Sequence, residues 1–213
     1  MSKVRVLLAD DHQIVAEGLR SLLEPEFELV GIVADGRAML SAARELRPDV
    51  VVLDISMPGL NGIEAAAQLR AAGSAARVIF LTMHREASYA ARALDAGAAG
   101  FVLKHAAATE LVAAIREAVQ GRTYVTPLIA ADLLREYRDR GDHRATDFGQ
   151  LTPRQREVLQ LVAEGHSAKE IARLLHISPR TAEFHKARLM ETLGATSTAD
   201  LVRHAIHHGL TPG

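Results

Sequence analysis

The chain has 213 residues, of which 48% are hydrophobic and 24% are charged, and its 25 basic and 26 acidic residues leave a formal net charge of −1. This composition is typical of a folded protein with one large or two small domains, and it argues against a surface that is basic throughout. The absence of cysteine excludes disulfides, iron–sulfur clusters and thiolate zinc sites. Because no apolar run approaches the roughly 20 residues of a membrane span and no cleavable signal pattern is present, we expect a cytoplasmic protein without a membrane partner.

Short apolar runs alternate with helical patterns over the first half of the chain, which is typical of parallel strands joined by crossover helices. The runs are rich in Val, Ile and Leu, as strands buried on both faces should be. They lie at residues 4–9, 27–34, 50–54, 77–82 and 100–104. Between and after them, apolar residues recur about every 3.6 residues, which predicts helices. We therefore predict a doubly wound α/β domain over residues 1–121, with five parallel strands in the flavodoxin-like order 2-1-3-4-5.

The alternation of strands and helices stops near Gly121, where Gly and Pro occupy turn positions. A short helix is expected over residues 128–137, and the sequence after it is charged and poor in core residues. Such a segment is typical of a connection between domains. We therefore predict a linker with a short helix at residues 122–147.

The remainder of the chain, residues 148–213, shows only helical patterns. The first three helices are each preceded by a residue type that caps helices, at Thr152, Ser167 and Ser178, and a fourth helix is predicted over residues 198–208. The apolar stripe of the fourth helix could complete the domain core or pair with a second copy of the chain. We predict a small all-α domain, and its slight excess of basic residues agrees with a nucleic-acid-binding module.

Three acidic side chains stand where predicted strands end. Asp10 and Asp11 follow the first strand, and Asp54 ends the third. In the predicted order these strands are neighbours, and ligands bind beyond the carboxyl ends of strands at such a switch point. So much negative charge in one crevice is costly without a hard cation, and Mg²⁺ prefers oxygen ligands. The sequence therefore predicts a magnesium site at this edge of the sheet.

Thr82 ends the predicted fourth strand, and Lys104 ends the fifth. A hydroxyl and an ammonium at the same edge provide a donor and a cation for a phosphoryl group, and Asp54 could act as the attacking carboxylate. Each residue alone is more often a cap, a loop residue or a solvated charge. Their combination favours phosphoryl chemistry.

The segments that contain these residues resemble the receiver domain of two-component response regulators, specifically of the NarL/FixJ type. The resemblance covers residues 3 to about 120 and rests on Leu8-Ala9-Asp10-Asp11-His12, Val51-Val52-Leu53-Asp54-Ile55-Ser56-Met57-Pro58-Gly59-Leu60-Asn61-Gly62, Leu81-Thr82-Met83-His84 and Ala96-Gly97-Ala98-Ala99-Gly100-Phe101-Val102-Leu103-Lys104. It implies that a cognate sensor histidine kinase phosphorylates Asp54. It also implies an Mg²⁺ site formed by Asp10, Asp11, Asp54 and the carbonyl of Ser56.

The resemblance further implies how phosphorylation is sensed. Thr82 and Lys104 would contact the phosphoryl oxygens. Phe101 would be the aromatic side chain that rotates into the space left by Thr82, although its position also suits an ordinary core phenylalanine. The surface formed by the fourth helix, the fifth strand and the fifth helix would then repack, which is a two-state response to a local change in charge.

DNA binding is indicated in residues 167–193, where two short helices joined by a tight turn follow a longer helix. The first would cross the DNA backbone, and the second would lie in the major groove. This part of the chain resembles the LuxR-type helix-turn-helix. The resemblance covers Leu151 to about Ile206 and rests on Leu151-Thr152-Pro153-Arg154-Gln155-Arg156-Glu157-Val158-Leu159, Lys169-Glu170-Ile171-Ala172 and Ser178-Pro179-Arg180-Thr181.

This resemblance implies two groups of DNA-contacting side chains. Those nearest the base edges would be Glu183, Phe184 and Ala187, and those holding phosphates would be Lys169, Arg180, Thr181, His185 and Lys186. Glu183 could accept a hydrogen bond from cytosine N4. A solvated carboxylate paired with Lys186 or Arg180 would have the same sequence pattern.

These features predict a transcription factor controlled by phosphorylation, and not an enzyme. Phosphorylated Asp54 would favour a homodimer that binds two half-sites of double-stranded DNA. Two other interpretations stay open. A regulator could bind DNA without phosphorylation, or an Mg²⁺-dependent phosphatase or phosphotransferase could use the same carboxylates, although such an enzyme would need a second acid where Ser56 stands.

Overall fold

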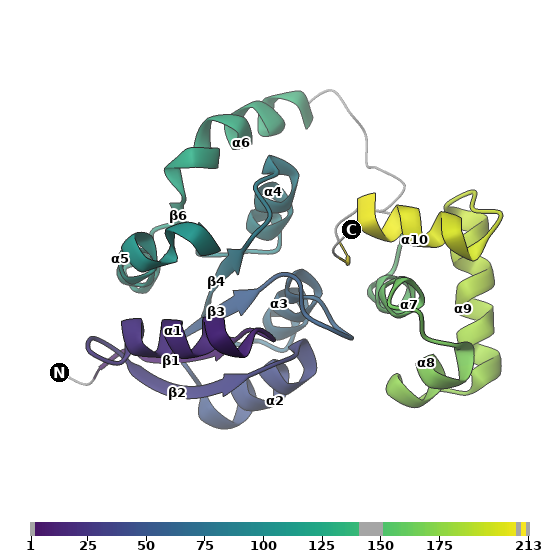
Figure 1. The fold of residues 1–213 in the computed structure, drawn as a ribbon, viewed down its shortest axis with the longest axis horizontal. Helices are drawn as coiled ribbons and strands as arrows, with labels where there is room; N and C mark the ends of the chain where they lie inside the picture. Colours follow the sequence, from purple (N-terminus) through teal and green to yellow (C-terminus); the bar gives the residue numbers. More distant parts are fainter. Residues whose placement is uncertain (1–2, 141–150, 208–209, 212–213) are drawn as a thin grey trace. The chain divides into compact units, whose positions relative to one another are not determined.

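The computed structural model describes residues 3–140, 151–207 and 210–211. The chain divides into two compact units, residues 1–140 and residues 141–213 (Figure 1). Residues 141–147 of the predicted linker, and the first three residues of the predicted helical domain, lie outside the described residues. In the ranges that are described, no helix has both the length and the apolar character of a membrane span.

The first unit is built on a parallel sheet of six strands in the order β2-β1-β3-β4-β5-β6. The strands are β1 (Arg5–Ala9), β2 (Glu28–Val33), β3 (Val50–Asp54), β4 (Arg77–Thr82), β5 (Gly100–Leu103) and β6 (Tyr124–Val125). The predicted order of the first five is confirmed. The predicted number is wrong, because Tyr124 and Val125 add a sixth strand by pairing with Gly100 and Phe101. Two residues are too few to show strand alternation, and the flanking Gly and Pro indicate a turn.

Helices cover both faces of this sheet (Figure 1). Helices α1 and α5 pack on one face, and α2, α3 and α4 pack on the other, which is the predicted doubly wound arrangement. Their bounds are α1 (Gln13–Leu23), α2 (Gly36–Leu46), α3 (Gly62–Ala71), α4 (Ala87–Asp95) and α5 (Ala107–Val119), with a 3₁₀ turn η1 (Lys104–Ala106) before α5.

The side chains of the central strands alternate between two apolar clusters, one on each face of the sheet. In β3, Val50 and Val52 belong to the cluster under α1 and α5, whereas Val51 and Leu53 belong to the cluster under α2, α3 and α4. All four are fully buried. Because helices cover both faces, such a strand has no polar side, and its polar residues are confined to its ends.

Helix α6 (Pro127–Arg140) packs with the first unit, although the sequence places this segment in a linker. Ile129 and Leu133 are buried in the apolar cluster that also contains α4 side chains. The Tyr137 hydroxyl donates to the Ala91 carbonyl at 3.4 Å and to the Asp95 carboxylate at 3.2 Å. The sequence does not indicate this packing, because only two of the helix's apolar residues face the core and the residues that follow are charged.

The second unit is a small helical bundle around its own apolar cluster. Its helices are α7 (Pro153–Ala163), α8 (Ala168–Leu174), α9 (Pro179–Thr192) and α10 (Thr198–His207), and they agree with the four predicted ones. Thr152, Ser167 and Ser178 each accept a hydrogen bond from the backbone N–H three residues further along, as capping residues should. Leu201 and Ala205 of α10 are fully buried, so this part of its apolar stripe completes the domain core.

The chain after β3 returns so close to the strand that only glycine fits at residue 62. The N–H of Gly62 donates to the Ile55 carbonyl at 2.9 Å. A Cβ atom on Gly62 would lie 2.1 Å from the carbonyl oxygen of Asp54. This close approach fixes the loop between Asp54 and α3.

We predict that Gly62→Ala lowers the free energy of unfolding of the first unit by about 2 to 3 kcal/mol, because the added Cβ forces two backbone segments apart. Gly18→Ala in α1 is the matched control, since nothing lies within 4 Å of a Cβ there. It should raise stability by about 0.5 to 1 kcal/mol through helix propensity. Urea unfolding followed by circular dichroism measures both changes, and equal stabilities for the two variants would contradict the close contact.

Candidate functional site

A buried ion-pair network lies at the carboxyl edge of the sheet. Asp10 follows β1, Asp54 ends β3, and Lys104 follows β5. The Nζ atom of Lys104 lies 2.8 Å from Oδ2 of Asp10 and 2.8 Å from Oδ2 of Asp54. None of the three side chains is more than 7% exposed. Removing the lysine would leave two uncompensated carboxylates in a buried place, which is strongly unfavourable.

Negative charge exceeds positive charge in this pocket. One ligand atom from each of Asp10, Asp11, His12 and Asp54 lies within 4.8 Å of the others. The Oδ2 atom of Asp10 is buried and, apart from its ion pair with Lys104, has no hydrogen-bond partner. A crowded set of hard oxygen donors in which carboxylates outnumber the one lysine suits a divalent cation such as Mg²⁺. The residues present therefore fit the metal that the sequence predicts.

The environment shifts the acidity of both central groups. Burial raises the pKa of Asp54, and the charge and hydrogen bond of Lys104 offset this only in part. Burial lowers the pKa of Lys104, but the neighbouring carboxylates of Asp54 and Asp10 more than offset this effect and raise the pKa overall. The lysine therefore stays charged at pH 7, and Asp54 is a more basic carboxylate than an exposed one.

Hydrogen bonds join the loops that follow β3 and β4. The N–H of Ser56 donates to Oδ1 of Asp54 at 3.3 Å, and the Ser56 hydroxyl is hydrogen-bonded to Nε2 of His84 at 2.8 Å. The N–H of His84 donates to the hydroxyl oxygen of Thr82 at 3.1 Å. Thr82 itself is wholly buried. His84, in the loop after β4, thus connects that loop to the loop after β3.

His84 also stacks on Tyr89 of α4, with ring centroids 4.1 Å apart and ring planes within 4° of parallel. Burial lowers the pKa of His84 more than Glu86 and Asp54 raise it, which favours the neutral ring. Tyr89 lies in the same apolar cluster as Phe101, which is fully buried. The burial of Phe101 fits a core phenylalanine and fits equally a side chain that rotates when space opens beside it.

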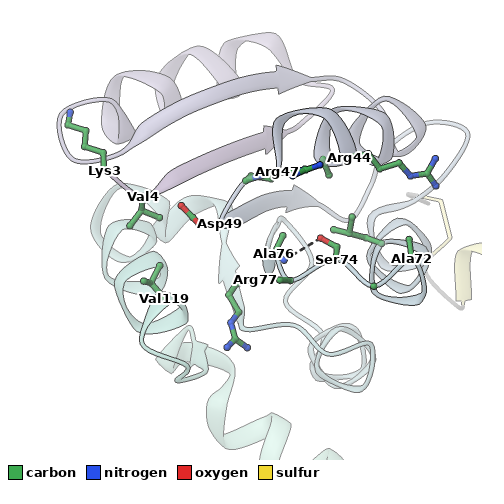
Figure 2. A pocket seen from close by; sticks show the side chains of 15 residues that line it. Lys3, Val4, Arg44, Arg47, Asp49, Ala72, Ser74, Ala76, Arg77 and Val119 are labelled. Carbon is green, nitrogen blue, oxygen red and sulfur yellow. Dashed lines mark hydrogen bonds between the residues drawn. The ribbon is translucent and has the colours of Figure 1, made fainter. Parts of the chain in front are cut away.

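A groove of about 880 Å³ lies at the opposite edge of the sheet, where the strands begin. Its lining includes the basic residues Lys3, Arg44, Arg47 and Arg77. Figure 2 shows that the side chains of Lys3, Arg44 and Arg77 point in different directions. Recognition of an anion needs donors that converge on it, so we assign no ligand to this groove.

In the second unit, α9 presents exposed side chains of contrasting chemistry. Phe184 is 60% exposed, and its ring meets the ring of His185 edge-on with centroids 6.0 Å apart. Glu183 is exposed and forms no ion pair or side-chain hydrogen bond with any residue in the described part of the chain. The pairing of Glu183 with Lys186 or Arg180, one of the two interpretations of the sequence, is therefore not found in the structure.

The other predicted DNA-contacting residues also lie on α9, except Lys169, which lies on α8. Those that are exposed are Lys169, Arg180 and Ala187, and those that are partly exposed are Thr181, His185 and Lys186. The Thr181 hydroxyl is hydrogen-bonded to the Ser178 hydroxyl at 2.8 Å, so it helps to cap α9. Arg188 forms an ion pair with Glu191 at 2.7 Å and is used within the helix.

Comparison with known proteins assigns both units. Residues 6–116 match the model of the response regulator receiver domain, and residues 149–205 match that of the luxR family of bacterial regulatory proteins. The chain is 39% identical to the transcriptional regulatory protein MctR of Rhizobium johnstonii over 210 residues, which are 98% of this chain and 95% of MctR. It is 34% identical to the response regulator GacA of Pseudomonas aeruginosa over 209 residues, which are 97% of each protein.

Solved structures give the same assignment. RcsB from Salmonella enterica serovar Typhimurium, bound to promoter rprA in the presence of the phosphomimetic BeF3−, is 30% identical with a TM-score of 0.63, covering 95% of this chain and 98% of RcsB. The chain belongs to the LuxR-type two-component response regulators. Its first unit is the receiver domain, and its second unit is the DNA-binding domain. The predicted family and fold class are confirmed, with the sixth strand as the one difference noted above.

Two histidines of the receiver pocket are missed by the sequence prediction. Nδ1 of His12 lies 2.8 Å from Oδ1 of Asp11 and 4.0 Å from Oδ2 of Asp54. A signal for both histidines exists, because His12 directly follows the acidic pair and His84 stands two residues after Thr82, where β4 ends. Tyr89 has no such signal, because only the packing of α4 brings it to His84.

We predict that Asp54→Asn stabilises the metal-free receiver domain at pH 7. Because the folded pKa of Asp54 lies above its ordinary 3.8, the folded state holds this proton more tightly, and the stability that the group contributes falls as the pH rises past 3.8. Asparagine does not titrate, so its advantage over the wild type should be small near pH 4 and larger at pH 7. Added Mg²⁺ should raise the melting temperature of the wild type but not of the variant.

Differential scanning calorimetry at both pH values, with and without Mg²⁺, measures these changes. Asp132→Asn is the control, because this carboxylate is 61% exposed and pairs with Arg135 on the surface. Two results would show that the buried carboxylate of Asp54 does not cause these effects. One is a gain in stability of Asp54→Asn over the wild type that is the same at both pH values, and the other is an equal rise in melting temperature of Asp54→Asn and Asp132→Asn with Mg²⁺.

Proposed function

We propose that Asp54 accepts a phosphoryl group from a sensor histidine kinase and that this phosphorylation controls DNA binding by the C-terminal domain. The observation that carries the proposal is the buried pair of Asp54 and Lys104, in which a nucleophilic oxygen and a fixed cation lie 2.8 Å apart. Membership of the response regulator family supports a phosphorylated histidine as the donor. The match to the luxR family supports double-stranded DNA as the second partner.

In the proposed reaction, a carboxylate oxygen of Asp54 attacks the phosphorus atom of a phosphohistidine on the kinase. The new P–O bond forms as the P–N bond breaks, and the released imidazole nitrogen keeps the electron pair and takes up a proton. The Lys104 ammonium reduces the repulsion between the anionic nucleophile and the anionic phosphoryl group. Its ion pairs with Asp10 and Asp54 hold it in place before the donor arrives.

Bound Mg²⁺ would supply further positive charge to the phosphoryl oxygens. Asp11, Asp54 and the carbonyl of Ser56 would hold it, and Asp10 would orient the site. The surplus of carboxylates over cations in the pocket supports this assignment.

Thr82 links phosphorylation to the shape of the domain in this proposal. Its hydroxyl oxygen accepts a hydrogen bond from His84, and a phosphoryl group on Asp54 would offer an acceptor to which the same hydroxyl can donate. Thr82 pairs with Leu103 of β5, and Phe101 lies two residues before that position on the same strand. Movement of Thr82 would therefore change the space available to Phe101. A new position of Phe101 would alter the surface of the receiver domain, and this altered surface would favour a homodimer.

For DNA, we propose that α9 lies in the major groove. Glu183 has no partner among the described side chains, which supports its use as an acceptor for cytosine N4, and the exposed ring of Phe184 suits a thymine methyl group. Ala187 leaves room for the approach of a base. The residues proposed to hold phosphates are Lys169, Arg180, Thr181, His185 and Lys186. In a homodimer two copies of α9 would bind two half-sites together, which raises affinity through effective concentration.

Acetyl phosphate with Mg²⁺ should add the mass of one phosphoryl group to the wild type and none to Asp54→Asn, as measured by intact mass spectrometry. On DNA fragments that the protein has selected from a random pool, a gel shift should show affinity rising at least about tenfold for the wild type only, because two tethered domains bind together. An equal gain in affinity for Asp54→Asn would favour the phosphorylation-independent regulator. Sustained release of inorganic phosphate without a change in DNA binding would favour the enzyme.

Lys186→Ala should weaken binding to all sequences alike and lower the slope of log affinity against log salt by ~1, because one phosphate contact is lost. Glu183→Ala should instead relax the preference at one base pair by about 1 to 3 kcal/mol. Glu191→Ala is the control on the same helix, since this glutamate is paired with Arg188. Binding selections at two salt concentrations measure both effects, and identical losses for Lys186→Ala and Glu183→Ala would refute the division into phosphate and base contacts.

A further inference from the structure

Helix α6 is held at its two ends by different parts of the receiver domain. Just before it, Thr126 is buried, its hydroxyl oxygen accepts from the Leu103 N–H at 3.2 Å, and its hydroxyl donates to Glu110 at 2.7 Å. This end is therefore fixed to β5 and α5. The rest of α6 packs on α4, where the Tyr137 hydroxyl donates to Ala91 and Asp95.

Helix α4 is also connected, through side-chain contacts, to the loop that follows Asp54. The Ser56 hydroxyl is bonded to the imidazole of His84, and that imidazole stacks on Tyr89 in the first turn of α4. Tyr89 in turn shares an apolar cluster with Ile129 and Leu133 of α6. A continuous set of contacts thus runs from the loop beside Asp54 to the last helix of the domain.

We propose that His84 and Tyr89 are positioning residues that transmit phosphorylation of Asp54 to α6, so that the phosphorylated receiver domain holds α6 less tightly. This inference rests on the proposed phosphorylation of Asp54. The partner of the contact is within the chain, and the response is a change in how firmly α6 is docked on α4.

The contacts around Asp54 explain why His84 responds. Two bonds hold its loop to the pocket, one from its backbone N–H to Thr82 and one from its ring to Ser56. Both Thr82 and Ser56 are neighbours of Asp54, and a phosphoryl group added there offers strong acceptor oxygens for the Thr82 hydroxyl and the Ser56 N–H. When the Thr82 hydroxyl and the Ser56 N–H turn toward the phosphoryl oxygens, the hydrogen bonds of His84 to these two residues are weakened.

The packing of α4 explains why α6 responds in turn. A close-packed interior transmits a displacement instead of absorbing it, so a shift of the His84 ring is passed to the stacked Tyr89. Helix α4 has only nine residues, so we expect it to move as one body. Its movement displaces the acceptors of Tyr137 and the apolar surface under Ile129 and Leu133, whereas the hydrogen bonds of Thr126 go to β5 and α5 and do not involve α4. Helix α6 would therefore loosen from its far end.

The experiment is amide hydrogen exchange of the full chain with Mg²⁺, with and without BeF3− as the phosphoryl mimic. We expect the peptide that covers α6 to exchange about tenfold faster after BeF3− is added, because the free energy of local opening falls. The His84→Phe variant keeps an aromatic ring to stack on Tyr89 but loses the bond to Ser56. The Tyr89→Leu variant keeps apolar bulk but loses the stacking. In both, exchange of α6 should respond to BeF3− by less than about twofold.

Two further measurements separate the possible outcomes. Tyr137→Phe removes only the hydroxyl that donates hydrogen bonds to α4. Without BeF3−, the amides of α6 should exchange faster in this variant than in the wild type. Protection of the loop after β3 reports BeF3− binding in every variant. Loop protection without faster exchange of α6 in the wild type would overturn the inference and leave the proposed function intact. A full α6 response in His84→Phe and Tyr89→Leu would also overturn it, whereas absence of loop protection and of phosphorylation in the wild type would refute the proposed function itself.

Discussion

The receiver domain depends on a lysine ammonium that is buried between two carboxylates. Lys104 joins the ends of β1, β3 and β5 through its contacts with Asp10 and Asp54, and these ion pairs offset part of the cost of burying the charges. The compensation is incomplete, since Asp11 adds a further negative charge and burial still raises the pKa of Asp54. Repulsion between the carboxylates therefore remains in the pocket, and added positive charge would reduce it.

The sequence was sufficient to predict this pocket because a parallel sheet places all its carboxyl ends at one edge. Asp10, Asp54, Thr82 and Lys104 each follow a run of buried residues, and the strand order alone brings them together. Contacts that depend on how the loops fold were not predictable in this way. The bond between Ser56 and His84, for example, depends on how two loops fold back on the sheet, and no periodic pattern records it.

The helical domain was predictable for a different reason. Its helices begin at Thr152, Ser167 and Ser178, whose side chains bond backbone groups only three residues away, so the signal is local in the sequence. Its core is likewise separate from the two clusters of the receiver domain. The sequence did not predict which surface side chains form ion pairs. Among the described residues, Glu183 forms none, whereas Arg188 pairs with Glu191.

Helix α6 also determines where the receiver domain can be cut from the rest of the chain. A fragment that ended at residue 121, where the strand and helix pattern stops, would lack β6 and both buried side chains of α6. The apolar surface that Ile129 and Leu133 cover would then face water, and such patches promote self-association. A fragment that continues to Arg140 keeps this surface covered, so studies of the isolated receiver domain should use the longer boundary.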